Sequence, residues 1–376
     1  MLKDMERIYD MIEVSHREQQ FVAVANGKAY AINECFYLIL SSLKKDATLE
    51  EAVGYLEQFY NLDCNDKQNI VDSFQSFIRK ISTTVSTVNN SYIKFQHTLL
   101  RSSLVVAVSR LFKVLFGVKI FWPVLLLASI VNILFFVLID KDGISLSLLS
   151  FSLGDFLILF MLSNAFVLLH ELGHSTASLR HGIQPGKIGF GFYLIFPVLF
   201  SDVTKSWLLP RRKRLVVNAG GVYFQLIVNV LLMSGYVLGA NSASENYLRY
   251  LILSNTLVIL YSLLPFFRND GYWVYSDLFD IPNLIEKADN FCWKDKQGRF
   301  SLPILQFAVL NWFFRGYIAL KLLEYVVSFI MDLHSPYFTL QYLKSFIVSV
   351  ACCYGFYKLV LSMFKLCSTN KIKEGY

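Results

Sequence analysis

The sequence predicts a mainly α-helical, polytopic membrane protein with about six transmembrane helices and a small α+β, winged-helix-like domain at its N-terminus. Of its 376 residues, 55% are hydrophobic and only 17% are charged, and its mean hydropathy is +0.46. Soluble domains carry about 25% charged residues. Apolar stretches long enough to cross a hydrocarbon core of about 30 Å recur after residue 100. The first 85 residues have a soluble composition instead.

The N-terminal segment is predicted to fold as two strands followed by three helices. The strands, residues 20–24 and 28–32, are joined by Asn26-Gly27, which is a strong hairpin signal. Side chains suited to cap a helix precede each helical pattern. The predicted caps are Asn33, Thr48 with Glu51, and Asn65 with Gln68. Since about 80 residues can bury a modest core, we expect a small cytosolic domain over residues 1–85.

The remainder of the chain is predicted to enter and cross the membrane. Residues 86–118 are expected to be a linker with an amphipathic membrane-entry segment, residues 119–365 a transmembrane domain, and residues 366–376 a cytosolic tail. The fifth apolar stretch contains Arg315, Lys321 and Glu324, so it could instead be partly interfacial. The six apolar stretches are residues 119–139, 151–175, 216–238, 248–267, 301–330 and 338–364.

The positive charges orient these stretches. The connection 176–215 is rich in Lys and Arg, whereas 239–247 and 331–337 contain neither. By the positive-inside rule, the connections 176–215 and 268–300 and both termini face the cytoplasm of a multi-pass protein. The first residues lack an apolar h-region, so we expect no cleaved signal peptide. The six cysteines form no CxxC pair, which disfavours a disulfide framework or a cysteine zinc site.

The most informative motif is His170-Glu171-Leu172-Gly173-His174, which follows the apolar run 156–169. On a helix, two histidines four positions apart share a face and can bind one zinc ion, with Glu171 beside them as a general base. Ionisable groups in a membrane helix are costly and mark functional sites. The motif therefore predicts a catalytic Zn²⁺ centre.

A zinc hydrolase usually needs a third protein ligand, and three candidates compete. His181 does not fit the HExxHxxGxxH pattern, which would place histidine where the chain has Arg180. Glu245 falls in a predicted external loop. Asp270 lies at the cytoplasmic end of the fourth stretch, at the predicted depth of the two histidines. We therefore predict Asp270 as the third ligand and Glu171 as the proton acceptor for the attacking water.

The motif at residues 170–174, followed two helices later by Asp270-Gly271, resembles the site-2 protease class of intramembrane zinc metalloproteases over residues 95–290. The segments 196–214 and 268–278 are similar to the bacterial peptide zinc metalloprotease branch of that class. The resemblance implies a zinc endopeptidase in a bacterial cell membrane, which cleaves near the cytoplasmic face.

Substrate-holding residues are less well defined. The class often carries a GPxxN-like element, where this chain has Gly220-Gly221-Val222-Tyr223-Phe224-Gln225. Gln225 either replaces the substrate-holding asparagine or is a buried packing amide. Residues 187–196 are β-prone and contain Phe190 and Phe192. This segment either adds a substrate peptide as an extra strand or packs against the bundle as a re-entrant hairpin.

The N-terminal domain resembles the PqqD-like peptide-recognition fold, on the hairpin that leads into the helix after Asn33 and the capped helix after Thr48. That resemblance implies binding of the leader segments of ribosomally made, modified peptides by strand addition. A nucleic-acid partner is disfavoured because residues 1–85 contain more acidic than basic residues. The net charge of +7 is assigned largely to loops facing the anionic lipid bilayer.

The sequence thus predicts an intramembrane zinc endopeptidase that cleaves a peptide precursor during peptide maturation and export. An intact Glu171 favours an enzyme, because a structural metal site needs no general base. Two alternatives stay open. The protein could be a non-catalytic peptide-binding scaffold for export or immunity, or it could cleave a membrane-anchored regulator.

Overall fold

The computed structural model is mainly helical and contains two three-stranded sheets in the residues that it describes. These residues fall into two compact units, 1–264 and 265–376. The described residues are 9, 12–17, 20–25, 28–45, 47–60, 64–86, 93–139, 152–193, 196–239, 242–266, 268–281, 284–289 and 300–332.

The first sheet is antiparallel with the strand order β1-β2-β3. Its strands are β1 (Glu13–Arg17), β2 (Gln20–Ala25) and β3 (Lys28–Ile32). The two predicted strands are confirmed, and the pairing of Ala25 with Lys28 fits a two-residue connection. The Asn26-Gly27 turn itself lies outside the described residues. The sequence did not predict β1, whose residues, Glu-Val-Ser-His-Arg, contain one apolar side chain and so carry little strand signal.

Three helices follow this sheet, as predicted: α2 (Glu34–Leu43), α3 (Leu49–Leu56) and α4 (Cys64–Ser86). Asn33 caps α2, since its Oδ1 accepts a hydrogen bond from the backbone N–H of Phe36 at 2.8 Å. Thr48 and Glu51 form the predicted reciprocal capping box of α3. The helix α4 begins at Cys64, so Asn65 lies in its first turn and is not its cap.

A hydrophobic core joins this sheet to these helices. It is built from the apolar side chains that recur along one face of each helix. All the buried residues of this core come from the first 81 residues. They are Ile12, Ala23, Ala25, Ile39, Leu40, Ala52, Val53, Leu56, Phe74, Ile78 and Ile81.

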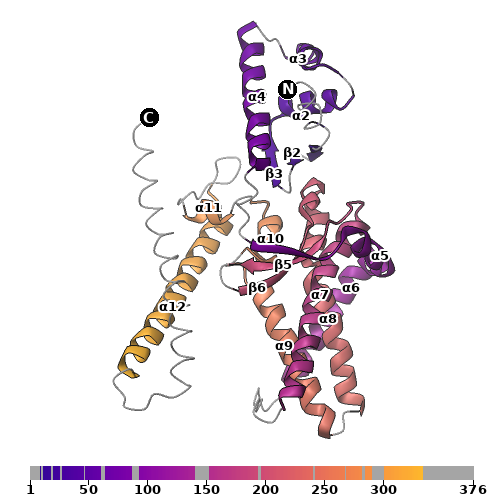
Figure 1. Cartoon of the computed structure of the whole chain (residues 1–376), viewed down its shortest axis with the longest axis vertical. Helices are drawn as coiled ribbons and strands as arrows, with labels where there is room; N and C mark the ends of the chain where they lie inside the picture. The colour runs from indigo at the N-terminus through magenta and orange to yellow at the C-terminus, as the bar shows by residue number, and fades with distance from the viewer. Residues whose placement is uncertain are drawn as a thin grey trace. The chain divides into compact units, whose positions relative to one another are not determined.

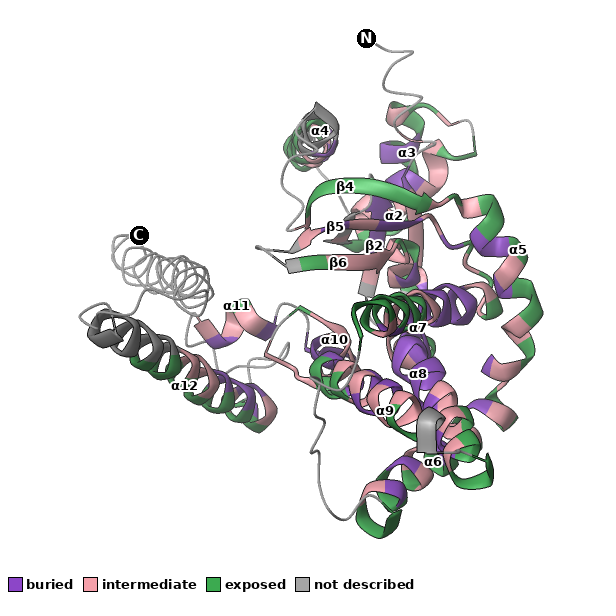
Figure 2. Ribbon diagram, turned by 60° about the horizontal axis from the view of Figure 1, so that its bottom comes forward, coloured by how far each residue is buried: buried purple, intermediate pink, exposed green. Residues whose placement is uncertain are grey.

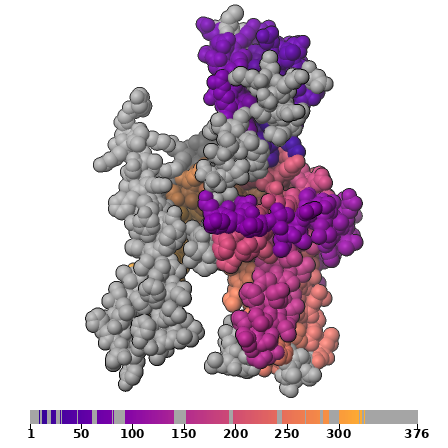
Figure 3. Space-filling model, viewed as in Figure 1, coloured from indigo at the N-terminus to yellow at the C-terminus, as the bar shows by residue number. Residues whose placement is uncertain are grey.

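The second sheet combines strands that are far apart in the chain. Its antiparallel order is β4-β5-β6, with β4 (Ile93–Leu100), β5 (Ile188–Tyr193) and β6 (Phe196–Ser201). The sequence did not predict β4, which lies in the segment expected to be a linker. Most residues of β4 are exposed, and the strand runs over the surface next to α5 (Ser102–Phe112) (Figure 3). An exposed strand lacks the apolar alternation that a sequence pattern can reveal.

Among the described residues, three helices are long and apolar enough to cross a membrane: Val118–Ile139, Leu153–Arg180 and Arg211–Gly239. The first consists of α6 (Val118–Leu134) and the π-helical η3 (Phe135–Ile139), and the others are α7 and α8. They match the first three predicted stretches.

The described residues do not confirm six transmembrane helices. The fourth and fifth correspond to α9 (Ser242–Leu263) and α12 (Leu302–Asp332), which are helical but are not among those three. The helix α9 begins with polar residues, and α12 carries charged ones. The sixth stretch, 338–364, lies outside the described residues.

In the first unit, α7 packs against α8, α9 and α5 (Figure 1). The 3₁₀ turn η2 (Lys113–Phe116) also contacts α7, and η5 (Thr204–Leu208) precedes α8. These contacts surround the second half of α7 with protein, and that half carries the predicted catalytic motif.

The second unit contains α10 (Asp270–Leu278), α11 (Leu284–Asp289) and α12. Tyr272 and Phe307 are the largest side chains of its core. Arg315, which interrupts the apolar pattern of α12, donates two hydrogen bonds to the carboxylate of Asp289, at 2.8 and 3.3 Å. This pair gives the cation a partner within a largely apolar helix.

Candidate metal centre

The helix α7 changes from exposed to buried along its length (Figure 2). Its first turns present apolar side chains to the surroundings, whereas His170, Glu171 and His174 are only 6%, 9% and 6% exposed. The helix continues to Arg180, five residues beyond the end of the predicted stretch 151–175, so the motif lies inside α7. The buried, mostly small residues 175–178 allow the helix to continue through the packed region.

The two histidines direct their Nε2 atoms toward each other, 3.1 Å apart. Nδ1 of His174 lies 2.8 Å from the backbone carbonyl oxygen of Val217, and Nδ1 of His170 lies 2.8 Å from Oε1 of Gln225. Because a carbonyl oxygen only accepts hydrogen bonds, each Nδ1 carries the proton and each Nε2 presents a lone pair. Two converging lone pairs, each fixed by a second hydrogen bond, are typical of metal-binding histidines.

Glycines on both helices bring α8 this close to the motif. A Cβ at Gly173 would lie 2.2 Å from the carbonyl oxygen of Gly220, so the two backbones touch. A Cβ at Gly221 would lie 2.5 Å from Nε2 of His170. Small residues at a helix crossing permit such an approach. Gly221 therefore leaves the space that the His170 imidazole fills, whereas Gly173 and Gly220 let the two backbones touch.

A chain of buried amides continues behind Gln225. Nδ2 of Asn255 donates to the backbone oxygen of Gln225 at 3.0 Å and to Oδ1 of Asn229 at 2.7 Å. Nδ2 of Asn229 donates to Oδ1 of Asn132 at 2.8 Å. The sequence analysis missed these three asparagines, although a single amide in an apolar helix is a signal of function or helix association. They connect α6, α8 and α9 behind the histidines.

The predicted ligand group consists of His170 and His174, which lie on α7 in the first unit, and Asp270, which belongs to the second unit. Asp270 is the first residue of α10, directly after its N-cap residue Asn269. Two neutral imidazoles and one carboxylate form a donor set of the kind that catalytic zinc uses, so the residues fit the predicted Zn²⁺.

The other candidate ligands lie elsewhere in the described structure. His181 is the C-cap residue of α7 and is not part of the group above. Burial lowers the pKa of its imidazole, and the nearby charges of Lys213 and Arg180 lower it further. Glu245 lies in α9 and accepts a hydrogen bond from the Tyr236 hydroxyl at 3.0 Å.

The predicted substrate-contacting residues occupy two places. Gln225 is fully buried and contacts His170. Phe190 and Phe192 are partly buried on β5, with ring centroids 5.4 Å apart. Since β5 is paired on both sides, by β4 and β6, it has no free edge. A peptide that joins this sheet as an extra strand must therefore pair with β4 or β6.

Comparisons with known proteins relate the chain to peptide metalloproteases. It is 25% identical over 160 residues to the protein named "Putative peptide zinc metalloprotease protein YydH" from Bacillus subtilis (strain 168). The match covers 41% of this chain and 60% of that relative, which is less than two thirds of the relative's length. No protein-family model and no solved structure matches the chain. The similarity supports a zinc metalloprotease-like relationship.

Proposed function

We propose that the protein is an integral-membrane zinc endopeptidase of the site-2 protease type, which cleaves a peptide precursor near the cytoplasmic face of the bacterial cell membrane. The observation that carries the proposal is the convergence of the two Nε2 atoms, 3.1 Å apart, with both Nδ1 atoms engaged on α8. The distant similarity to a peptide zinc metalloprotease supports it.

In this proposal His170, His174 and Asp270 hold the zinc ion. When bound, zinc polarises the scissile carbonyl and lowers the pKa of water. The Val217 carbonyl and Gln225 orient the two imidazoles through their Nδ1 protons. Glu171, buried beside His170, accepts a proton from the attacking water and passes it to the leaving amine.

The substrate segment must be extended to reach this buried site, because a helix already uses its backbone groups internally. We assign its binding to an outer strand of the β4-β5-β6 sheet, β4 or β6, by strand addition. Phe190 and Phe192 then contribute apolar contacts from the central strand. Gln225 is fully buried against His170, which supports a positioning role for it over a substrate-holding one.

The N-terminal domain is proposed to recruit the precursor by its leader segment. The domain lies beside the connection between α7 and α8: Ser15 Oγ donates to the backbone oxygen of Leu208 at 3.2 Å, and Lys205 pairs with Glu13. Both outer strands of its sheet, β1 and β3, have a side not paired within the described residues. Either side can accept an extended leader as a fourth strand.

Co-expression with the peptides encoded beside the gene tests this function, with intact-mass spectrometry of the peptides as the readout. The parent protein should convert one peptide into two fragments, whereas Glu171→Gln should leave it uncut and keep its zinc. Glu171→Gln preserves the size of the side chain but removes the base. A Glu171→Gln protein that cleaves the peptide as well as the parent would contradict the role of Glu171 as the base. A parent protein that leaves the peptide uncut, together with a Glu171→Gln protein that supports export equally well, would establish the non-catalytic scaffold instead.

A further inference from the structure

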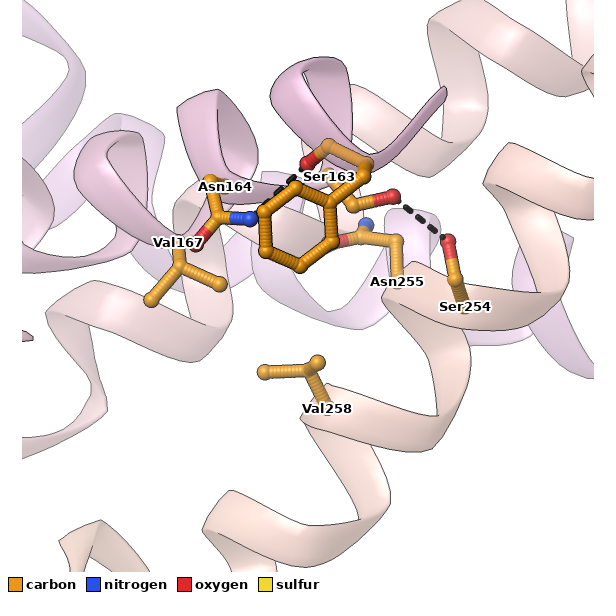
Figure 4. Close-up of a pocket in the computed structure, with 7 residues that line it drawn as sticks. Ser163, Asn164, Val167, Ser254, Asn255 and Val258 are labelled. Atoms are coloured by element: carbon orange, nitrogen blue, oxygen red, sulfur yellow. Dashed lines mark hydrogen bonds between the residues drawn. The ribbon is translucent and has the colours of Figure 1, made fainter. Parts of the chain in front are cut away.

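A cavity of about 120 Å³ lies between α7 and α9 and is partly open; Figure 4 shows the residues that line it. It is separate from the histidine pair. Its lining combines apolar side chains with hydroxyls and amides. The lining residues are Phe160, Ser163, Asn164 and Val167 from α7, and Ser254, Asn255 and Val258 from α9.

The cavity lies far from both ends of a helix that can cross a membrane. Ser163 is ten residues after Leu153 and 17 before Arg180, which corresponds to roughly 15 Å and 26 Å along the helix axis. Nearby apolar side chains such as Met161 and Leu257 are exposed on the helix surfaces. Lipid tails therefore surround the outside of this region, and they offer no hydrogen-bond donors.

One polar atom in the cavity wall lacks a donor. The Ser163 and Ser254 hydroxyls bond each other at 3.3 Å, and Nδ2 of Asn164 donates to the Phe160 carbonyl. Asn255 is only 3% exposed, and its Nδ2 donates hydrogen bonds to the backbone oxygen of Gln225 and to Oδ1 of Asn229. No donor among the described residues reaches its Oδ1. A buried acceptor without a partner is costly, so this oxygen requires a donor from an occupant.

Water is the occupant that these observations favour. The cavity is far larger than the roughly 15 Å³ that one water needs on the same measure. Lipid headgroups, the other common donors in a membrane, stay near the interface. We propose that the cavity between α9 and the apolar helix α7 is a water-binding site and that its water donates to Oδ1 of Asn255.

This water would fix the orientation of a residue behind the metal centre. With Oδ1 turned to the cavity, Nδ2 of Asn255 faces the Gln225 carbonyl and Asn229. Gln225 in turn contacts His170. The cavity, Asn255 and Gln225 thus form a hydrogen-bonded path to the Nδ1 side of His170. The proposal depends on the helix packing and does not require that the protein is a protease.

Water-edited solid-state NMR of the full chain, labelled with ¹³C,¹⁵N-asparagine, in vesicles of deuterated phosphatidylcholine tests the proposal. Polarisation from water should reach the side chain of Asn255 several-fold faster than that of Asn229, which belongs to the same network but does not line the cavity. Asparagine substitutions assign the two signals. Equal, slow transfer to both residues would overturn the proposal.

A matched pair of variants gives a second measurement. Val258→Phe fills the cavity and should slow the transfer to Asn255 to the rate of Asn229. Leu257→Phe adds similar bulk at a neighbouring side chain that is 56% exposed, and it should leave the transfer fast. Fast transfer that persists in Val258→Phe would contradict water binding in this cavity, because the polarisation would then reach Asn255 by another route. Neither result depends on whether a peptide is cleaved.

Discussion

Gly221 faces His170 across the α7–α8 crossing, and a Cβ at Gly221 would lie 2.5 Å from Nε2 of the imidazole. The glycine on one helix therefore defines the space in which the histidine of the other can present its lone pair. At Gly173 the contact is tighter still, because a Cβ there would lie 2.2 Å from the carbonyl oxygen of Gly220, where the two backbones meet.

Gly221→Ala should displace His170 and lower zinc affinity by about 10-fold or more, the scale of effects from residues that orient metal ligands. Competition with a chelator of known affinity measures this change. Gly235→Ala, in the same helix, is the control: its Cβ would have no neighbour closer than 4.0 Å. It should keep full zinc affinity and gain about 0.5–1 kcal/mol of stability from helix propensity. Equal zinc affinity in both variants would contradict the packing role of Gly221.

His170→Ala, His174→Ala and Asp270→Ala should each lose most of the bound zinc, because a three-ligand site missing one ligand cannot keep its geometry. Elemental analysis of the purified protein provides the measurement, with one zinc per parent chain expected. His181→Ala should keep its zinc. If Asp270→Ala retains zinc and His181→Ala loses it, the third ligand is His181.

Gln225→Leu should weaken zinc binding by about 10- to 100-fold, because Nδ1 of His170 loses its acceptor. Gln225→Glu keeps an acceptor at that position and should restore binding. A purely structural role of Gln225 would give a different pattern, in which both variants lower the folded yield and neither changes zinc affinity selectively. Chelator competition and thermal unfolding of the same samples separate the two cases.

Deletion of residues 1–85 should raise the peptide concentration needed for half-maximal cleavage and leave zinc content unchanged. A leader bound to the N-terminal sheet holds the cleavage site near the metal centre, and a short tether gives effective concentrations in roughly the millimolar range. The rate at saturating peptide should therefore change much less than the half-maximal concentration. An unchanged concentration dependence would remove the domain from peptide recruitment.

Local signals predicted many elements correctly. The caps at Asn33 and at Thr48 with Glu51 act within one helical turn, and both appear as predicted. The apolar runs that became α6, α7 and α8 follow from length and composition alone. The strands β1 and β4 were missed because their stability depends on partners, and their mixed polar and apolar residues carry no sustained periodic pattern.

The sequence by itself determined that His170 and His174 share one face of an apolar helix, because a spacing of four residues closes one helical turn. It also determined that Glu171 lies beside them. Only the tertiary structure decided what holds the two imidazoles: the Val217 carbonyl and Gln225, 43 and 55 residues away in the chain. Those contacts depend on the depth and rotation of α8 against α7. The close approach of the two helix backbones at their glycines determines this depth and this rotation. The spacing of residues along the sequence does not predict that approach.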